Sequence, residues 1–150
     1  MPWTYRHASR EWRAFLDDAK DRMDLVSDNM AYTAIDAVFQ VFRARLTAAE
    51  GLAFASILPS VPRAIFVHDW DVRRDPLPFA NRATLIAEVK AIRPHHNLTP
   101  ENAIEATAFA VRRAVNARDF ERVLAELPPP ARDFWDVPNV DPAELQPRIV

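Results

Sequence analysis

Residues 27–45 carry the most regular pattern of apolar and polar positions in the chain, and this pattern predicts a long, nearly buried helix. Between the two ends of this stretch, almost all positions outside one set of polar residues are apolar, including Tyr32, Phe39 and Phe42. The polar positions recur at steps of four and three residues, so they form one narrow stripe along a helix. A helix with one thin polar stripe must be surrounded on most sides by other elements, so we expect it to lie at the centre of a core. The stripe consists of Asn29, Thr33, Asp36, Gln40 and Arg43.

Apolar residues at steps of three and four predict further helices on both sides of this central one. Residues 9–23 form the first of them, with Ser9 as the candidate N-cap. Thr47 and Glu50 form a capping-box pattern, which opens another helix that Pro59 ends. A short helix with a closing apolar pair follows.

The second half of the chain repeats this order of elements after a charged connector at residues 68–78. Residues 79–92 predict a helix with one apolar side. Thr99 and Pro100 then predict the N-cap and first residue of a second central helix. Asn116 caps the next helix, and a short helix again follows a Leu-Pro pair.

The two halves also match residue by residue. Residues 58–66 align with residues 127–135: Leu-Pro, an Arg five residues after the Leu and a closing apolar pair all recur. The two central helices match at an offset of 72. We therefore predict an all-α fold made by tandem duplication of a unit of three long helices and one short helix. Each unit alone would expose a core face, so about eight helices form one compact domain. The predicted divisions are an N-terminal extension (1–8), a domain of two repeats (9–67 and 79–135) and a C-terminal tail (136–150).

The composition supports a helical fold and narrows the classes of function. Thirteen prolines and one glycine among 150 residues disfavour the many glycine turns of an all-β protein. The net charge of -2 argues against a general nucleic-acid binder. The absence of cysteine excludes disulfides and cysteine nucleophiles. No apolar run approaches the roughly 20 residues of a membrane helix, so we expect a cytoplasmic protein with no membrane partner.

Taken together, the repeated pattern resembles the DUF2267 family of uncharacterised, mostly bacterial, all-helical proteins. The features that carry the resemblance are two Ala-rich capped helices, two amphipathic helices ending in Leu-Pro, and two Arg residues followed by an apolar pair. It covers about residues 10–135. The resemblance implies an all-helical repeat fold and supplies no catalytic residues or cofactors. The chain departs from an even repeat at Gly51, which stands where the second half has Phe120.

Two groups of residues suggest chemistry, and each also has a simpler explanation. His95 and His96, with Asp69, suggest a small-ligand or metal site between the repeats, of an enzyme or a binding protein. Adjacent histidines project apart, however, and solvated loop residues are the simpler explanation.

The second group contains the only basic cluster and suggests contact with an anion or a nucleic acid. Acidic residues share the same helices, so ion pairs within the domain are the simpler explanation. The cluster consists of Arg112, Arg113, Arg118 and Arg122.

Surplus apolar residues lead to the preferred hypothesis. Leu52 and Ile57 stand where the corresponding helix of the second half is polar. Trp3 and Trp70 add aromatic side chains of a kind enriched in protein interfaces. Either these residues pack within the domain or they form a patch for a partner. With no catalytic signature, we expect a small non-enzymatic helical module that binds a protein partner or self-associates as a homodimer.

Overall fold

The computed structural model describes residues 1–93 and 99–150, and within these ranges it contains helices and no strand. The predicted all-α class is therefore confirmed. Within the described ranges, no helix is long and apolar enough to cross a membrane. The helices are α1 (Trp3–Arg6), α2 (Ala8–Arg22), α3 (Asp28–Arg43), α4 (Ala48–Ser56), α5 (Ser60–Val67), α6 (Arg82–Ala91), α7 (Ala103–Ala114), α8 (Ala117–Glu126), α9 (Pro130–Phe134) and a 3-10 helix, η1 (Pro142–Leu145).

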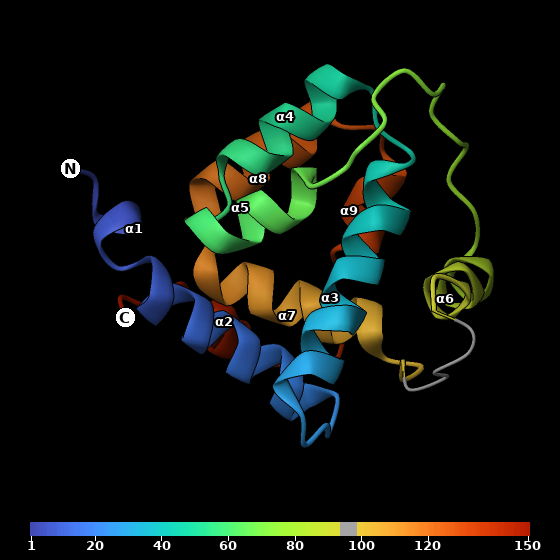
Figure 1. The fold of residues 1–150 in the computed structure, drawn as a ribbon. Helices are drawn as coiled ribbons and strands as arrows, with labels where there is room; N and C mark the ends of the chain where they lie inside the picture. Colours follow the sequence, from blue (N-terminus) through green and yellow to red (C-terminus); the bar gives the residue numbers. More distant parts are fainter. Residues whose placement is uncertain (94–98) are drawn as a thin grey trace.

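Helix α3 is the centre of the fold, as its apolar pattern predicts. The Ser27 hydroxyl caps it by accepting a hydrogen bond from the Met30 N–H at 3.3 Å. Its buried residues include Ile35, Phe39 and Phe42, none of them more than 1% exposed. It contacts α2, α5, α6 and α7, which lie on different sides of it (Figure 1). Burial on most sides follows from the narrowness of the polar stripe.

Two residues of α3 differ from the prediction. Tyr32 is 37% exposed, although the pattern placed it among the core residues. Arg43 is only 9% exposed, although the pattern placed it on the polar stripe. Its guanidinium donates to the carbonyl oxygens of Phe66 and His68, at 2.9 Å each. Arg43 is buried because the end of α5 packs against the end of α3 and offers it these acceptors.

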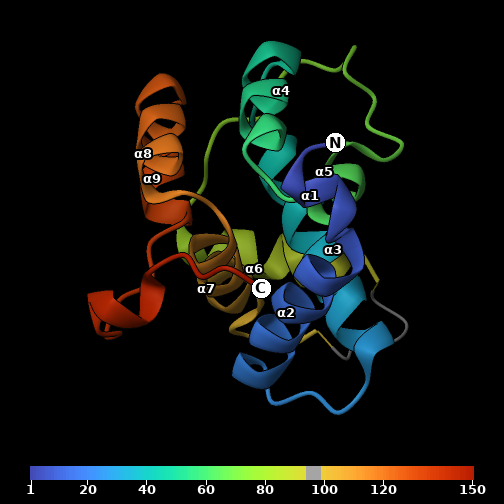
Figure 2. The same ribbon diagram turned by 90° about the vertical axis from the view of Figure 1, so that its left-hand side faces the viewer.

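The two halves of the chain pack across each other. Helix α2 makes its most extensive contacts with α7, and α6 makes its most extensive contacts with α3. Figure 2 shows α2 beside α7, and α4 also contacts α8. The first long helix of each half therefore lies against the central helix of the other half, and the two halves share a continuous core.

Two helix starts differ from the prediction. Helix α2 begins at Ala8, and the N-cap position is occupied by His7 instead of the predicted Ser9. Thr99 and Pro100 do not open α7, which begins at Ala103. The Asn102 side chain donates instead to the carbonyl oxygen of Arg22 at 2.8 Å and ties the start of α7 to the end of α2.

Helix α6 is shorter than predicted. The Asn81 side chain accepts a hydrogen bond from the Thr84 N–H at 2.8 Å, so α6 begins at Arg82 rather than at Phe79. The capping box of Thr47 and Glu50 and the Asn116 cap form as predicted. The C-terminal tail contains only the single turn η1.

Candidate interaction surface

Helix α1 is fixed to the start of α5 by hydrogen bonds between Thr4 and Ser60. The Ser60 N–H donates to the Thr4 hydroxyl at 3.3 Å, and the Ser60 hydroxyl donates to the Thr4 carbonyl at 3.0 Å. The first N–H groups of any helix lack partners within the helix. Residue Pro59, which precedes α5, supplies no side-chain cap. Thr4 therefore acts as a cap from a distant segment and gives α1 a defined position.

Arg63 connects α1 to the end of α4. Its guanidinium donates to the carbonyl oxygens of Ala55, Ser56 and Leu58, at 3.1, 3.1 and 3.0 Å. Ala55 and Ser56 are the last residues of α4 and Leu58 follows it, so the guanidinium lies at the C-terminal end of this helix. The Nη1 atom of Arg63 also lies 3.5 Å from the Tyr5 hydroxyl. Arg63 therefore sits between the exposed sides of α1 and α4.

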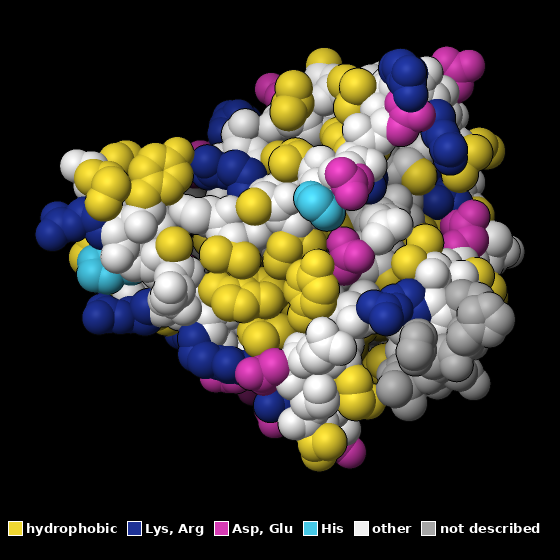
Figure 3. Space-filling model, viewed as in Figure 1, with side chains coloured by type: hydrophobic (Ala, Val, Ile, Leu, Met, Phe, Trp, Pro, Cys, Tyr) yellow, Lys and Arg dark blue, Asp and Glu magenta, His cyan; other side chains and the backbone are white. Residues whose placement is uncertain are grey.

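Large apolar side chains are exposed on both of these helices. Trp3 and Tyr5 of α1 are 51% and 52% exposed, and Leu52 of α4 is 58% exposed. Ile57 is half-buried and packs against the core at the end of α4. We call the surface formed by Trp3, Tyr5, Leu52, Ile57 and Arg63 the α1/α4 surface. In Figure 3, apolar and basic side chains lie next to each other at the end of the molecule that holds the N-terminus.

Trp70 differs from these residues because its ring packs against the core side of α4. It is half-buried, and its ring lies over Gly51 of α4 and 6.1 Å from the ring of Phe66. A Cβ atom at position 51 would overlap the Trp70 ring, so only glycine fits there. This contact explains why the first half has Gly51 where the second half has Phe120. Trp70 covers the core, and we leave it out of the α1/α4 surface.

A groove of about 430 Å³ lies between α3, the connector and α6. Arg43, Asp69 and Trp70 are among the residues that line it. Burial lowers the pKa of the Arg43 guanidinium. His95 and His96, the other residues of the predicted metal or ligand site, lie outside the described residues.

Two acidic residues of the connector, Asp69 and Asp71, lie beside neighbouring basic side chains. The Asp69 carboxylate lies 3.3 Å from Nε2 of His68. Asp71 accepts hydrogen bonds from Arg73, which lower its pKa. Among the residues that the structure describes, no group of three His, Cys, Asp or Glu side chains is arranged to hold a metal ion.

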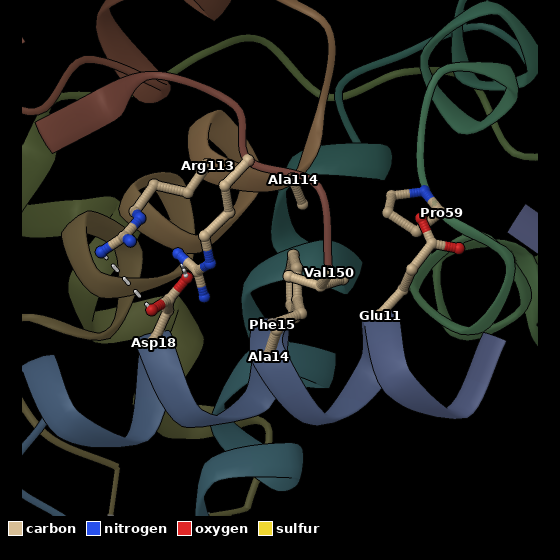
Figure 4. A pocket seen from close by; sticks show the side chains of 9 residues that line it. Glu11, Ala14, Phe15, Asp18, Pro59, Arg113, Ala114 and Val150 are labelled. Atoms are coloured by element: carbon tan, nitrogen blue, oxygen red, sulfur yellow. Dashed lines mark ion pairs between the residues drawn. The ribbon is translucent and has the colours of Figure 1, made fainter. Parts of the chain in front are cut away.

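Two members of the predicted basic cluster make contacts within the domain. The Nε atom of Arg112 donates to the carbonyl oxygen of Trp135 at 2.7 Å, and burial lowers the pKa of this guanidinium. Arg113 reaches toward Asp18 of α2, with 3.6 Å between the charged atoms, beside a cavity of about 20 Å³ (Figure 4). Arg118 and Arg122 are exposed on α8, where Arg122 lies 3.5 Å from Asp119.

The sequence predicts Leu52, Ile57 and Trp3 as surface residues but not the arginines of the same segments. Arg63 enters the prediction only as part of a repeat motif, and Arg6 and Arg10 are not predicted. The spacing of three residues between Trp3 and Arg6 is a local signal for Arg6. The contact between Arg63 and Tyr5, by contrast, depends on the docking of α1 onto α5.

The fold and this surface together define an all-α protein with an exposed apolar face beside arginine side chains. The family model described as an uncharacterized conserved protein, DUF2267, matches residues 12–134. The chain therefore belongs to the DUF2267 family, as the sequence resemblance predicts. No curated protein matches the chain.

Proposed function

We propose that the chain is a non-enzymatic helical module that binds another protein through the α1/α4 surface. The observation that carries this proposal is the exposure of Trp3, Tyr5 and Leu52 on α1 and α4, two helices that Arg63 connects. Single exposed apolar residues are common on any protein, whereas several of them together are typical of an interaction site. The hydrogen bonds of Thr4 and Arg63 hold the two helices in place, so the surface is formed before a partner binds.

We also propose that the fold arose by tandem duplication. A hydrogen bond that occurs at corresponding positions in both halves supports this proposal. Arg43 donates to the carbonyl of Phe66, and Arg112 donates to the carbonyl of Trp135, so each bond spans 23 residues. Arg43 and Arg112 are 69 residues apart, and so are Phe66 and Trp135. This offset of 69 residues differs from the 72 residues predicted for the central helices. It equals the offset between the Leu-Pro segments at residues 58–66 and 127–135.

Two further features support the duplication. The N-caps of α4 and α8, Thr47 and Asn116, are also 69 residues apart. The packing of α2 on α7 is matched by the packing of α6 on α3, as expected if the two units exchange places under a pseudo-two-fold rotation.

Photo-crosslinking in cells of the source organism tests the binding function. A photoreactive phenylalanine analogue replaces Trp3, and we expect one discrete crosslinked protein. Leu52→Glu should abolish this adduct, because a carboxylate would be placed in an apolar contact. Val26→Glu is the matched control, since Val26 is 90% exposed and lies in the turn between α2 and α3. The absence of an adduct, or one that survives Leu52→Glu, would contradict the proposal.

A second candidate function is small-ligand binding in the connector groove, and the size of the groove is the observation that favours it. A volume of about 430 Å³ lies within the range of small-molecule sites. A thermal-shift screen of metabolites and divalent metals tests this function, with Asp69→Asn as the comparison. We expect a ligand that raises the melting temperature of the original chain more than that of the variant; no shift with any compound would remove this candidate.

A further inference from the structure

We infer that the partner of the α1/α4 surface is an acidic protein segment, in which aspartate or glutamate side chains flank an apolar anchor. This inference rests on the proposed function and specifies the chemistry of the partner. It follows from the charges beside the exposed aromatic residues.

Arg6 and Arg10 supply the first part of the charge. Both side chains are exposed, and no carboxylate of the described residues lies within ion-pair distance of either one. Arg13, one turn further along α2, is different: it pairs with Asp17 at 2.6 Å and with Asp28 at 2.8 Å. Positive charge is therefore left without a counter-charge specifically at the N-terminal end.

The two arginines lie on either side of the break between α1 and α2. Trp3 and Arg6 are three residues apart within α1, so they share a side of that helix. His7, with φ -118° and ψ 24°, separates the two helices, and Arg10 lies in the first turn of α2. The rings of Trp3 and His7 lie 3.8 Å from each other at this break.

Arg63 supplies a further charge on the same surface. Its hydrogen bonds go to carbonyl oxygens and to the Tyr5 hydroxyl, which are neutral groups. No carboxylate of the described residues pairs with it, so its full charge remains. The three carbonyls also hold the guanidinium in a fixed position, which reduces the entropy lost when a carboxylate binds.

The combination of residue types favours a protein over other partners. Trp, Tyr and Arg are the residues most enriched in the energetic centres of protein interfaces, and arginine pairs with carboxylates through two parallel hydrogen bonds. A two-fold contact with a second copy would place the arginines of both copies together and cost repulsion.

Lipid and nucleic acid fit this surface less well. Anionic lipid attracts roughly 1 kcal/mol per basic residue and typically requires a cluster of four or more. Here three arginines stand on a protein with a net charge of -2. The same net charge argues against a nucleic-acid partner.

Selection of displayed random-sequence peptides on the full-length chain tests the inference. We expect the recovered peptides to be enriched in aspartate and glutamate around an aromatic or aliphatic residue. A synthetic peptide from this set should bind about tenfold more weakly to the Arg6→Glu/Arg10→Glu variant and should lose affinity as salt rises. Because both side chains are exposed, this variant should fold, whereas a change at Arg63 would remove the cap of α4.

The matched control is Arg118→Glu/Arg122→Glu, which makes the same change of charge on α8. It should change the affinity of the peptide less than about twofold, because salt screens the interaction between the bound peptide and charges on a distant surface. An equal loss of affinity in both variants would overturn the inference, since net charge rather than the α1/α4 surface would then explain the binding.

Other outcomes separate this inference from the proposed function. Peptides without acidic enrichment that still require Trp3 would overturn the inference and leave the binding function in place. Peptides insensitive to both Trp3→Ala and Leu52→Glu, or no recovered peptides, would overturn both. Binding to phosphatidylserine vesicles that is lost in Arg6→Glu/Arg10→Glu, or a dimer in light scattering that Leu52→Glu dissociates, would replace the acidic segment with a different occupant.

Discussion

The central helices α3 and α7 end in the same way but fill the core differently. An arginine near the end of each donates to the carbonyl of a buried aromatic residue: Arg43 to Phe66 at 2.9 Å and Arg112 to Trp135 at 2.7 Å. Along their buried sides, α3 contributes the two rings of Phe39 and Phe42, whereas four of the eight buried residues of α7 are alanines and Phe109 is its one buried ring. The polar contact is therefore shared by the two halves, while the volume of the core is divided unequally.

This inequality explains how the halves fit together. Short alanine side chains let a neighbouring helix approach α7 closely, and α2 makes its most extensive contacts there. The large rings of α3 reach outward to the aromatic residues of α5 and α9. Small residues on one central helix and large ones on the other are therefore complementary in a shared core.

At two other pairs of corresponding positions, the two halves make different contacts. Arg63 caps α4 through three carbonyls, whereas Arg132, at the same place in the second half, pairs with Glu121 at 2.6 Å. Gly51 admits the Trp70 ring, whereas Phe120 fills the equivalent space itself. The local neighbours that each half offers decide what the side chain does.

The largest expected effect is the truncation of a ring on α3. Phe42 has the centroids of five other aromatic rings within 6.4 Å of its own. Phe42→Ala should lower the free energy of unfolding by about 3–5 kcal/mol, because it leaves a large cavity. Val111→Ala, 69 positions later on α7, should cost less because only two methyl groups are removed. Urea denaturation compares them, and equal losses would contradict the unequal division of the core.

The next effect concerns the two shared arginine contacts. Arg43→Met leaves two carbonyls without their donor, and each buried unpaired group costs about 1–3 kcal/mol. Arg112→Met leaves only the carbonyl of Trp135. We expect the first variant to lose more stability than the second in thermal unfolding. A larger loss in Arg112→Met would contradict the ranking by the number of carbonyls left without a donor.

A smaller effect is expected where the two halves differ at Gly51. Gly51→Ala should destabilise the protein by about 1–3 kcal/mol, because the new methyl group displaces the Trp70 ring. In a Trp70→Ala background the same change should instead stabilise α4, by up to about 1 kcal/mol, because alanine favours helix more than glycine. A double-mutant cycle measured by urea denaturation tests this coupling. Additive effects would show that the ring contact does not restrict position 51.

The smallest effect concerns the start of α3, where Arg13 and Lys20 of α2 hold the Asp28 carboxylate, whereas a single cation, Arg22, pairs with Glu105 in the first turn of α7. Hydrogen bonds from Arg13, and then from Lys20, lower the pKa of Asp28. A carboxylate with a lowered pKa stabilises the fold above its ordinary pKa near 4, and this stabilisation is lost as pH falls through the lower folded value.

Asp28→Asn should therefore be slightly less stable than the original chain at neutral pH and should lose less stability on acidification. Melting temperatures between pH 7 and about pH 2 test this, over the range in which an ordinary aspartate titrates. Parallel curves for the two proteins would show that the contacts of Asp28 with Arg13 and Lys20 contribute nothing.

Much of the helical framework could be predicted because its signals are local. Ser27, Thr47 and Asn116 each cap a helix through a main-chain N–H only two or three residues away. The apolar period of α3 likewise depends only on helix geometry. The connector and the final turn at Asp141 were predictable for the same reason, since prolines and short caps act within a few residues.

The candidate surface was predictable only in part. Leu52 and Trp3 stood out as apolar residues without an amphipathic role, but the sequence left open whether they were covered. Trp70 is likewise a large apolar residue without an amphipathic role, but its ring packs over Gly51. The structure distinguishes these residues because burial depends on which other segment packs against each of them. In this fold, that segment comes from elsewhere in the chain.

By itself, the sequence determined the helical class, the central helix, most helix caps and the membership of the DUF2267 family. Only the tertiary structure decided how the long side chains are used: Arg43 and Arg63 look like surface residues but bind carbonyls at helix ends. It also decided that α1 docks onto the start of α5 and that Trp3, Tyr5 and Leu52 stay exposed. The physical reason is range, because caps and hydrophobic periods act over a few residues, whereas these contacts join residues up to 56 positions apart.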